Sequence, residues 1–155
     1  MTGAPYIAVV GPGRADRPQL TEAEAVGRGL AEAGAVVVCG GLGGVMEAAC
    51  RGAREAGGIT LGLLPGIDRS AANAWVSLAV PTGLGEARNA LVVRAADAVI
   101  AMAGEYGTLS EIALALKAGK PVVGIGTWDL GRTPDPIARA REGAEAVALA
   151  LAAVR

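Results

Sequence analysis

Two short glycine motifs, each followed by a glutamate, stand where apolar runs give way to helical patterns. The first is Gly40-x-x-Gly43-x-x-x-Glu47, and the second is Gly104-x-x-Gly107-x-x-x-Glu111. In a strand–turn–helix connection the first N–H groups of the helix and its dipole favour an anion at the turn. Glycine places no Cβ between the backbone and a bound group, and it permits positive φ. The spacing therefore predicts a phosphate-binding loop and indicates that one strand–turn–helix solution is used twice.

Acid–base chemistry has to come from residues other than histidine, because the sequence contains none. This excludes Ser-His-Asp and Cys-His catalysis and removes the commonest ligand of transition metals, so we expect no resident metal ion. Acid–base work would fall to Asp, Glu, Lys, Tyr or water, and Arg88 and Glu111 are charged candidate residues near the glycine turns.

Both candidates also have an ordinary structural explanation. Thr108 and Glu111 have the spacing of a capping box, in which Glu111 would accept a hydrogen bond from the Thr108 N–H. Arg88 stands among apolar helical residues, where a solvated or snorkelling arginine is common. Its position just after Gly83-Leu84-Gly85 also suits a cleft.

Other polar and aromatic residues leave similar alternatives open. Arg14 could reach a phosphate or face water, and Tyr106 could stack on a base or be an ordinary loop aromatic. Asn73 and Asn89 could contact a base or ribose, but loop and cap roles explain them equally well.

Apolar runs rich in β-branched residues alternate with helical patterns along the chain. We expect strands at residues 6–10, 36–39, 60–64, 75–80, 98–102 and 122–125, with a further short one at 137–140. We expect helices at 21–33, after Gly44 through 55, at 85–96, at 108–118 and from 142 to the C-terminus. Thr21 and Glu24 predict a capping box at the start of the first helix.

Continuous apolar strands alternating with helices indicate a parallel sheet covered on both faces. We therefore expect an α/β protein, a three-layer α/β/α Rossmann-like sandwich with a parallel sheet of about six or seven strands. Ligands bind at the carboxyl ends of such strands. Glycine turns are common in helix–sheet connections, but three at one edge favour a cleft. The candidate phosphate- or nucleotide-binding residues are Gly11, Gly13, Gly41, Gly43, Gly44, Asn89, Gly104, Gly107 and Thr108.

Three familiar nucleotide and hydrolase signatures do not fit. The turn after the first strand lacks the third glycine of a dinucleotide fingerprint, and the second strand ends in Cys39-Gly40 instead of an acidic residue. The sequence also contains no P-loop motif and no G-x-S-x-G elbow. NAD, P-loop and α/β-hydrolase chemistry are therefore disfavoured.

Composition limits the remaining classes. A chain of 155 residues fits a single domain, residues 1–155. The net charge of −1 argues against a nucleic-acid or membrane-surface partner. No apolar run approaches a membrane span, no signal peptide is evident, and Cys39 and Cys50 form no disulfide scaffold pattern, so we expect a cytoplasmic protein.

The motifs resemble those of the Lonely-Guy-like superfamily, whose hallmark is P-G-G-x-G-T-x-x-E. The matching segment runs from Ala103 to Glu111, and the similarity extends upstream through residues 83–89 and back to the turn at 40–47. Two positions depart from the hallmark, since Ala103 replaces its proline and Glu105 its second glycine. A carboxylate beside a phosphate disfavours anion binding unless it points away or is paired.

The resemblance implies a Rossmann-like fold, a homo-oligomer (dimer or tetramer) and a phosphate loop at Gly104, Gly107 and Thr108. In the members that hydrolyse cytokinin nucleoside 5′-monophosphates to free base and ribose 5-phosphate, Arg88 and Glu111 match the catalytic positions. The pair Arg88-Asn89 looks more like the branch of molybdenum-cofactor carriers. We therefore expect a protein that binds a phosphorylated nucleotide or nucleotide-like cofactor, with molybdenum cofactor as candidate cargo. The alternative is a nucleoside 5′-monophosphate phosphoribohydrolase, and a purely structural protein would leave the glycine turns without a function.

Overall fold

The structure is a computed structural model that describes residues 3–155. Its strands are β1 (Tyr6–Val10), β2 (Val36–Cys39), β3 (Thr60–Leu64), β4 (Leu78–Pro81), β5 (Ala98–Met102), β6 (Val122–Ile125) and β7 (Ala138–Arg139). Its α-helices are α1 (Arg17–Glu32), α2 (Val45–Glu55), α3 (Arg88–Ala95), α4 (Tyr106–Lys117) and α5 (Gly143–Ala153). Two short 3₁₀ turns, η1 (Arg69–Ala71) and η2 (Gly85–Ala87), precede β4 and α3.

The seven strands form one sheet in the order β4-β3-β2-β1-β5-β6-β7, and every neighbouring pair is parallel. The chain winds outward from β1 to β4 and then returns to pair β5 with the other side of β1. The order therefore reverses between β1 and β5, which is where ligands bind in doubly wound sheets. This confirms the expected Rossmann-like three-layer fold.

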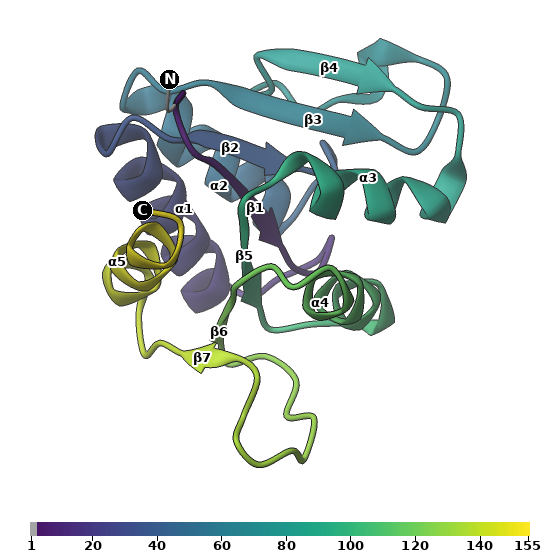
Figure 1. The fold of residues 1–155 in the computed structure, drawn as a ribbon. Helices are drawn as coiled ribbons and strands as arrows, with labels where there is room; N and C mark the ends of the chain where they lie inside the picture. Colours follow the sequence, from purple (N-terminus) through teal and green to yellow (C-terminus); the bar gives the residue numbers. More distant parts are fainter. Residues whose placement is uncertain (1–2) are drawn as a thin grey trace.

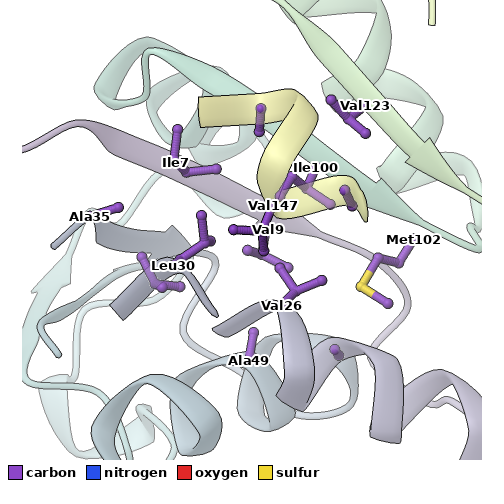
Figure 2. Close-up of a cluster of buried hydrophobic side chains, with 14 of the residues drawn as sticks. Ile7, Val9, Val26, Leu30, Ala35, Ala49, Ile100, Met102, Val123 and Val147 are labelled. Atoms are coloured by element: carbon purple, nitrogen blue, oxygen red, sulfur yellow. The ribbon is translucent and has the colours of Figure 1, made fainter. Parts of the chain in front are cut away.

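Alternation along β1 divides the core between the two faces of the sheet. Ile7 and Val9 pack with residues of α1, α2 and α5, whereas Ala8 and Val10 pack with residues of α3 and α4. Figure 1 shows these two groups of helices on opposite sides of the sheet. Figure 2 shows the first cluster, in which Val9 lies among side chains from α1 and α5. Val, Ile, Leu and Ala fill both clusters almost entirely, since the chain has no phenylalanine.

The first helix begins earlier than the sequence analysis expects. Asp16 is its N-cap and forms a capping box with Gln19, in which each side chain bonds the other's backbone N–H. Thr21 lies in the second turn and its hydroxyl donates to the Arg17 carbonyl at 3.0 Å. The predicted Thr21–Glu24 capping box is therefore wrong. A proline in the first turn, with φ already set for a helix, favours the earlier start.

Two further boundaries differ from expectation. The fourth strand begins at Leu78 and not at Trp75, because the Asn73 carbonyl and side chain bond the amides of Val76 and Trp75 in a turn. The helix expected at 85–96 is divided into η2 and α3. Within residues 3–155, no helix combines the length and apolar character needed to cross a bilayer.

Candidate functional site

A cleft opens between the carboxyl ends of β1 and β5, at the reversal of the strand order. It has a volume of about 160 Å³. Its floor is the end of β1, and its sides come from the loop after β1, the end of β2, the start of α3 and the first turn of α4. The lining residues are Val9, Val10, Gly11, Pro12, Gly13, Gly40, Met46, Arg88, Asn89, Glu105, Gly107, Thr108 and Glu111.

The loop after β1 needs glycine for steric reasons. A Cβ on Gly11 would lie 2.8 Å from Val45 Cγ1 and 2.9 Å from the Met102 carbonyl oxygen. A Cβ on Gly44 would lie 2.3 Å from the Pro12 carbonyl oxygen, and this carbonyl accepts a hydrogen bond from the Val45 N–H at 3.1 Å. The loops after β1 and β2 are therefore pressed together, and the loop after β1 already occupies the first N–H of α2.

The N-terminus of α4, unlike that of α2, has no loop of the described chain bonded to its first N–H groups. Glu105 occupies the N-cap position, but its side chain makes no capping hydrogen bond. The first N–H groups of a helix have no partner within the helix, so those of Tyr106, Gly107 and Thr108 remain open to a ligand at the cleft. Glu105 has a φ of −97°, which any residue adopts, so replacing the hallmark glycine causes no backbone strain. The strained position is Ala103, whose φ is +49°.

Glu111 is one of three buried polar or charged residues among residues 3–155, with 8% of its surface exposed. It lies one turn beyond the start of α4, which begins at Tyr106, so the predicted capping box with Thr108 is wrong. Burial raises the pKa of the Glu111 carboxyl to about 7, against the opposing effect of the positive charge of Arg88. The carboxyl can therefore take up or release a proton near neutral pH.

Arg88 begins α3, and its guanidinium spans the cleft towards the end of β2. Its Nη2 lies 3.4 Å from the carbonyl oxygen of Gly40, and its Nη1 donates to the side chain of Asn89. Its Nε is buried and is the one buried side-chain N or O atom without a hydrogen-bond partner in the described chain. A Cβ on Gly40 would lie 2.6 Å from Nη2, so this glycine makes room for the guanidinium.

Asn89 connects the two helices that flank the cleft. Its amide nitrogen lies 3.3 Å from Ser110 Oγ, which donates to the Gly107 carbonyl at 2.6 Å. These bonds orient the side-chain oxygen of Asn89 towards Arg88. Thr108, a buried hydroxyl residue with 3% of its surface exposed, also lines the cleft.

The structure brings together seven of the eleven site residues named from the sequence. They are Gly11, Gly13, Arg88, Asn89, Gly107, Thr108 and Glu111. Gly104 lines a neighbouring cavity instead, together with Arg14. Gly41, Gly43 and Gly44 line neither cavity. Gly41 packs on Leu64, where a Cβ would lie 2.7 Å from Cδ2, and it has a φ of +78°.

Among the other lining residues, Pro12 and Gly40 belong to glycine turns that the sequence analysis expects at this edge of the sheet, whereas Met46 was not expected there. Gly40 is the first residue after β2, and such positions face the cleft in parallel sheets. Nothing in the sequence signals Met46, since its role depends on how α2 packs against the loop after β1.

Two free thiols lie behind the cleft. The Sγ atoms of Cys39 and Cys50 are 3.5 Å apart and both residues are buried. The hydrogen bond from Cys50 is the main cause that lowers the pKa of Cys39, and the same bond together with burial raises the pKa of Cys50. The Gly41 N–H also points at Cys39 Sγ, at 3.3 Å.

The fold and the cleft define a Rossmann-like α/β protein whose site lies at the topological reversal of its sheet. A model of the SLOG cluster4 family matches residues 4–152, and the chain belongs to that family. The molybdenum cofactor binding protein from Rippkaea orientalis is 36% identical over 100% of both chains, with a TM-score of 0.93. A Moco carrier protein from Chlamydomonas reinhardtii is 38% identical over 97% of both chains, with a TM-score of 0.86.

A curated relative from Archaeoglobus fulgidus, described as uncharacterized, is 43% identical over 119 residues, which cover 77% of this chain and 78% of the relative. The structural neighbours confirm the resemblance to the Lonely-Guy-like superfamily and to its carrier-like branch.

Proposed function

We propose that this protein binds a phosphorylated, nucleotide-like cofactor in the cleft between β1 and β5, and that molybdenum cofactor or a related pterin phosphate is its cargo. The observation that carries the proposal is the uncapped N-terminus of α4 facing the guanidinium of Arg88, which has an unpartnered buried Nε. Backbone N–H groups and a guanidinium are the donors that phosphate oxygens prefer.

The residues of the cleft fit the phosphate end of such a cargo. The open N–H groups at Gly107 and Thr108, the Thr108 hydroxyl and the Arg88 fork surround one space. Solved relatives with more than 35% identity are described as a molybdenum cofactor binding protein and a Moco carrier protein, which supports this choice of cargo.

The experiment is calorimetric titration of the protein with anaerobically prepared molybdenum cofactor and with a pterin monophosphate. Gly107→Asp places a carboxylate at the open helix terminus, where the nearest atom to a Cβ is 3.9 Å away, so we expect a folded protein that has lost binding. Gly66→Asp is the matched control, because a Cβ there meets nothing within 4 Å and the residue lines neither cavity. Equal affinity in the two variants would contradict the proposed phosphate position.

A second function is favoured by one observation, the buried Glu111 carboxyl with a pKa of about 7 beside Arg88. In a nucleoside 5′-monophosphate phosphoribohydrolase, Glu111 would orient water or the ribose hydroxyls and stabilise an oxocarbenium-like transition state, while Arg88 would assist the departing base.

Incubation with a panel of nucleoside 5′-monophosphates, followed by detection of free base, separates the two functions. A hydrolase releases base, and Glu111→Gln abolishes the release while largely retaining the affinity for the substrate. A wild-type protein that binds a pterin phosphate tightly and releases no base from any monophosphate is a carrier.

A further inference from the structure

A second cavity adjoins the cleft and has a volume of about 450 Å³. It lies between the start of α1, the loop after β5 and the loop that joins β6 to β7, which protrudes from the sheet in Figure 1. Its lining residues are Pro12, Arg14, Gln19, Ala103, Gly104, Glu105, Gly126, Thr127 and Trp128. Pro12 and Glu105 line both cavities, so one ligand can extend from the first into the second.

Trp128 is an aromatic wall of this cavity that is held in place before any ligand arrives. Its indole N–H donates to the Glu105 carbonyl at 3.2 Å, and its ring stacks with Tyr106 at a centroid distance of 5.8 Å. Tyr106 does not line the cavity, so it supports the indole from another side. Gly104 leaves room for the indole edge, since a Cβ there would lie 2.8 Å from Nε1.

Hydrogen bonds from two sides hold the loop that carries Trp128 against the sheet. Thr127 Oγ1 donates to the Ala103 carbonyl at 2.5 Å. Arg139 of β7 donates to the carbonyls of Thr127 and Trp128, at 3.4 and 2.9 Å, and is itself held by Asp135 at 2.7 Å. A side chain fixed in this way loses little entropy when a ring stacks on it.

Polar groups around the cavity are matched to a heterocycle with both acceptors and donors. Arg14 makes no hydrogen bond or ion pair with any of residues 3–155. Gln19 uses its Oε1 in the capping box, which leaves its amide N–H groups for an acceptor. Glu105 offers a carboxylate, which pairs with two adjacent N–H donors at once.

We propose that this second cavity is a ring subsite for a 2-amino-4-oxo pyrimidine-fused bicycle, the ring system shared by pterins and guanine. The ring lies against Trp128, the carboxylate of Glu105 accepts from its N–H and amino group, and Arg14 or Gln19 donates to its carbonyl oxygen. The inference rests on the proposed function, because the phosphate of the same ligand occupies the adjoining cleft.

This assignment gives a role to Glu105, which replaces a glycine of the superfamily hallmark. A carboxylate next to a phosphate site costs anion affinity unless it has a partner. A ring with paired N–H donors supplies that partner, and a ring without them leaves the carboxylate unpaired. Glu105 therefore acts as a residue that selects the ring.

The test is calorimetric titration of the protein with four probes, which are a pterin monophosphate, GMP, AMP and ribose 5-phosphate. We expect pterin monophosphate and GMP to bind more tightly than AMP, and ribose 5-phosphate to bind most weakly. Trp128→Ala is expected to weaken binding of the ring-bearing probes about tenfold and to leave ribose 5-phosphate unchanged. Trp75→Ala, the same change at a tryptophan that lines neither cavity, is the control.

Two further variants separate ring selection from folding. Glu105→Gln is expected to remove most of the preference for GMP over AMP, and its side chain makes no cap bond that the change could break. Arg139→Ala, a change in a positioning residue, is expected to weaken ring binding without altering affinity for ribose 5-phosphate.

The outcomes distinguish this inference from the proposed function. If ribose 5-phosphate and the pterin probe bind but Trp128→Ala affects neither or both equally, the ring subsite is overturned and the phosphate site stands. If GMP and AMP bind equally to the wild type, the role of Glu105 is overturned. If no phosphorylated probe binds to the wild type, the proposed function and the ring subsite fall together.

Discussion

Environment, and not sequence spacing, separates the two glutamates that follow the glycine motifs. Glu47 and Glu111 stand at the same distance from their glycines, but Glu111 is buried against the cleft whereas Glu47 is partly exposed in the first turn of α2. The loop after β1 occupies the first N–H of α2 and leaves the start of α4 open. Only the second copy of the motif therefore combines a buried carboxyl with an open helix terminus.

The raised pKa of Glu111 predicts a pH-dependent stability. The unfolded chain releases this proton near pH 4.5, while the folded protein keeps it until about pH 7. The free energy of unfolding should therefore decrease as the pH rises from 4.5 to about 7, by about 3 kcal/mol, and change no further from this group above pH 7.

Denaturant unfolding of the wild type and Glu111→Gln at several pH values measures this effect. The amide does not ionise, so the variant should lack this part of the slope and gain relative stability above pH 7. Glu47→Gln is the control and should retain the slope. An unchanged slope in Glu111→Gln would show that the folded carboxyl titrates like an exposed one.

Arg88 should contribute to anion binding through its positive charge and the paired N–H donors of its guanidinium. Arg88→Ala is expected to weaken binding of a phosphorylated ligand at least tenfold, of the order expected when a charged hydrogen-bond partner is removed. Arg94→Ala, six residues further along α3 and outside both cavities, is the control for helix composition and net charge. Calorimetric titration measures both, and equal affinities would remove Arg88 from the site.

At the level of residues, the sequence predicted the cleft better than the roles of its members. Gly11, Gly107, Arg88 and Glu111 converge because a parallel sheet brings the carboxyl ends of its strands to one edge. The predicted caps failed because the Thr-x-x-Glu spacing does not by itself fix where a helix begins, and the N-cap positions are occupied by Asp16 and Glu105 instead. Trp128 could not be predicted as part of a cavity, since its position depends on the long connection to β7.

Among the elements, α3 has an unusual C-terminus that depends on a distant lysine. Lys120 Nζ donates to the carbonyls of Val93 and Arg94, at 2.8 and 3.0 Å, and to that of Ala96. Burial lowers the pKa of Lys120, opposed by the negative charge of Asp97. The lysine, which stands just before β6, thus binds carbonyls at the end of the helix that carries Arg88.

Lys120→Met should therefore destabilise the protein by about 1–3 kcal/mol, because three carbonyls lose a charged hydrogen-bond donor. Lys117→Met is the control, since the side chain of this exposed lysine makes no hydrogen bond within residues 3–155. Thermal or denaturant unfolding measures the difference. If the two variants were equally stable, water would be replacing the ammonium without cost.

Helices α1 and α2 pack through glycines that bring their backbones into close contact. A Cβ on Gly27 would lie 1.9 Å from the Ala49 carbonyl oxygen, and one on Gly52 would lie 2.0 Å from the Glu24 carbonyl oxygen. Ion pairs between Arg51 and Glu24 and between Arg28 and Glu55 lie across the same pair of helices. The sequence predicted both helices, but a glycine within a helix does not by itself reveal which neighbour it admits.

Gly27→Ala should destabilise the protein by about 3 kcal/mol or more, since the added methyl group meets backbone atoms that cannot rotate away. Gly29→Ala lies on the same helix and would meet Val147 Cγ2 at 3.2 Å, a side chain that can adjust. We expect this control to be close to neutral, because alanine favours the helix. Equal losses in the two variants would show that helix propensity, and not the interhelical contact, sets the cost.

At the scale of the whole molecule, apolar side chains gather on the face formed by η2, α3 and α4. Leu84 is 52% exposed, Leu91 38%, Tyr106 80% and Leu114 36%. A groove between α3 and α4 is lined by Ala87, Ala90, Tyr106 and Leu114 together with Glu86, Asn89, Gly107 and Ser110, and the first four add apolar surface between the helices. Apolar patches of this kind commonly mark protein–protein contacts.

We predict that the protein forms a homo-oligomer through this face. Leu91→Glu combined with Leu114→Glu should lower the molar mass measured by light scattering to that of a single chain, because charges would be buried without partners at the contact. Leu149→Glu is the control, since this leucine has the same exposure as Leu114, 36%, but lies on α5 at the opposite face of the sheet. Circular dichroism has to show that all variants are folded. A wild-type protein that is monomeric at micromolar concentration contradicts the prediction. If the oligomer persists in the double variant but dissociates in Leu149→Glu, the contact lies on the face of α5 instead.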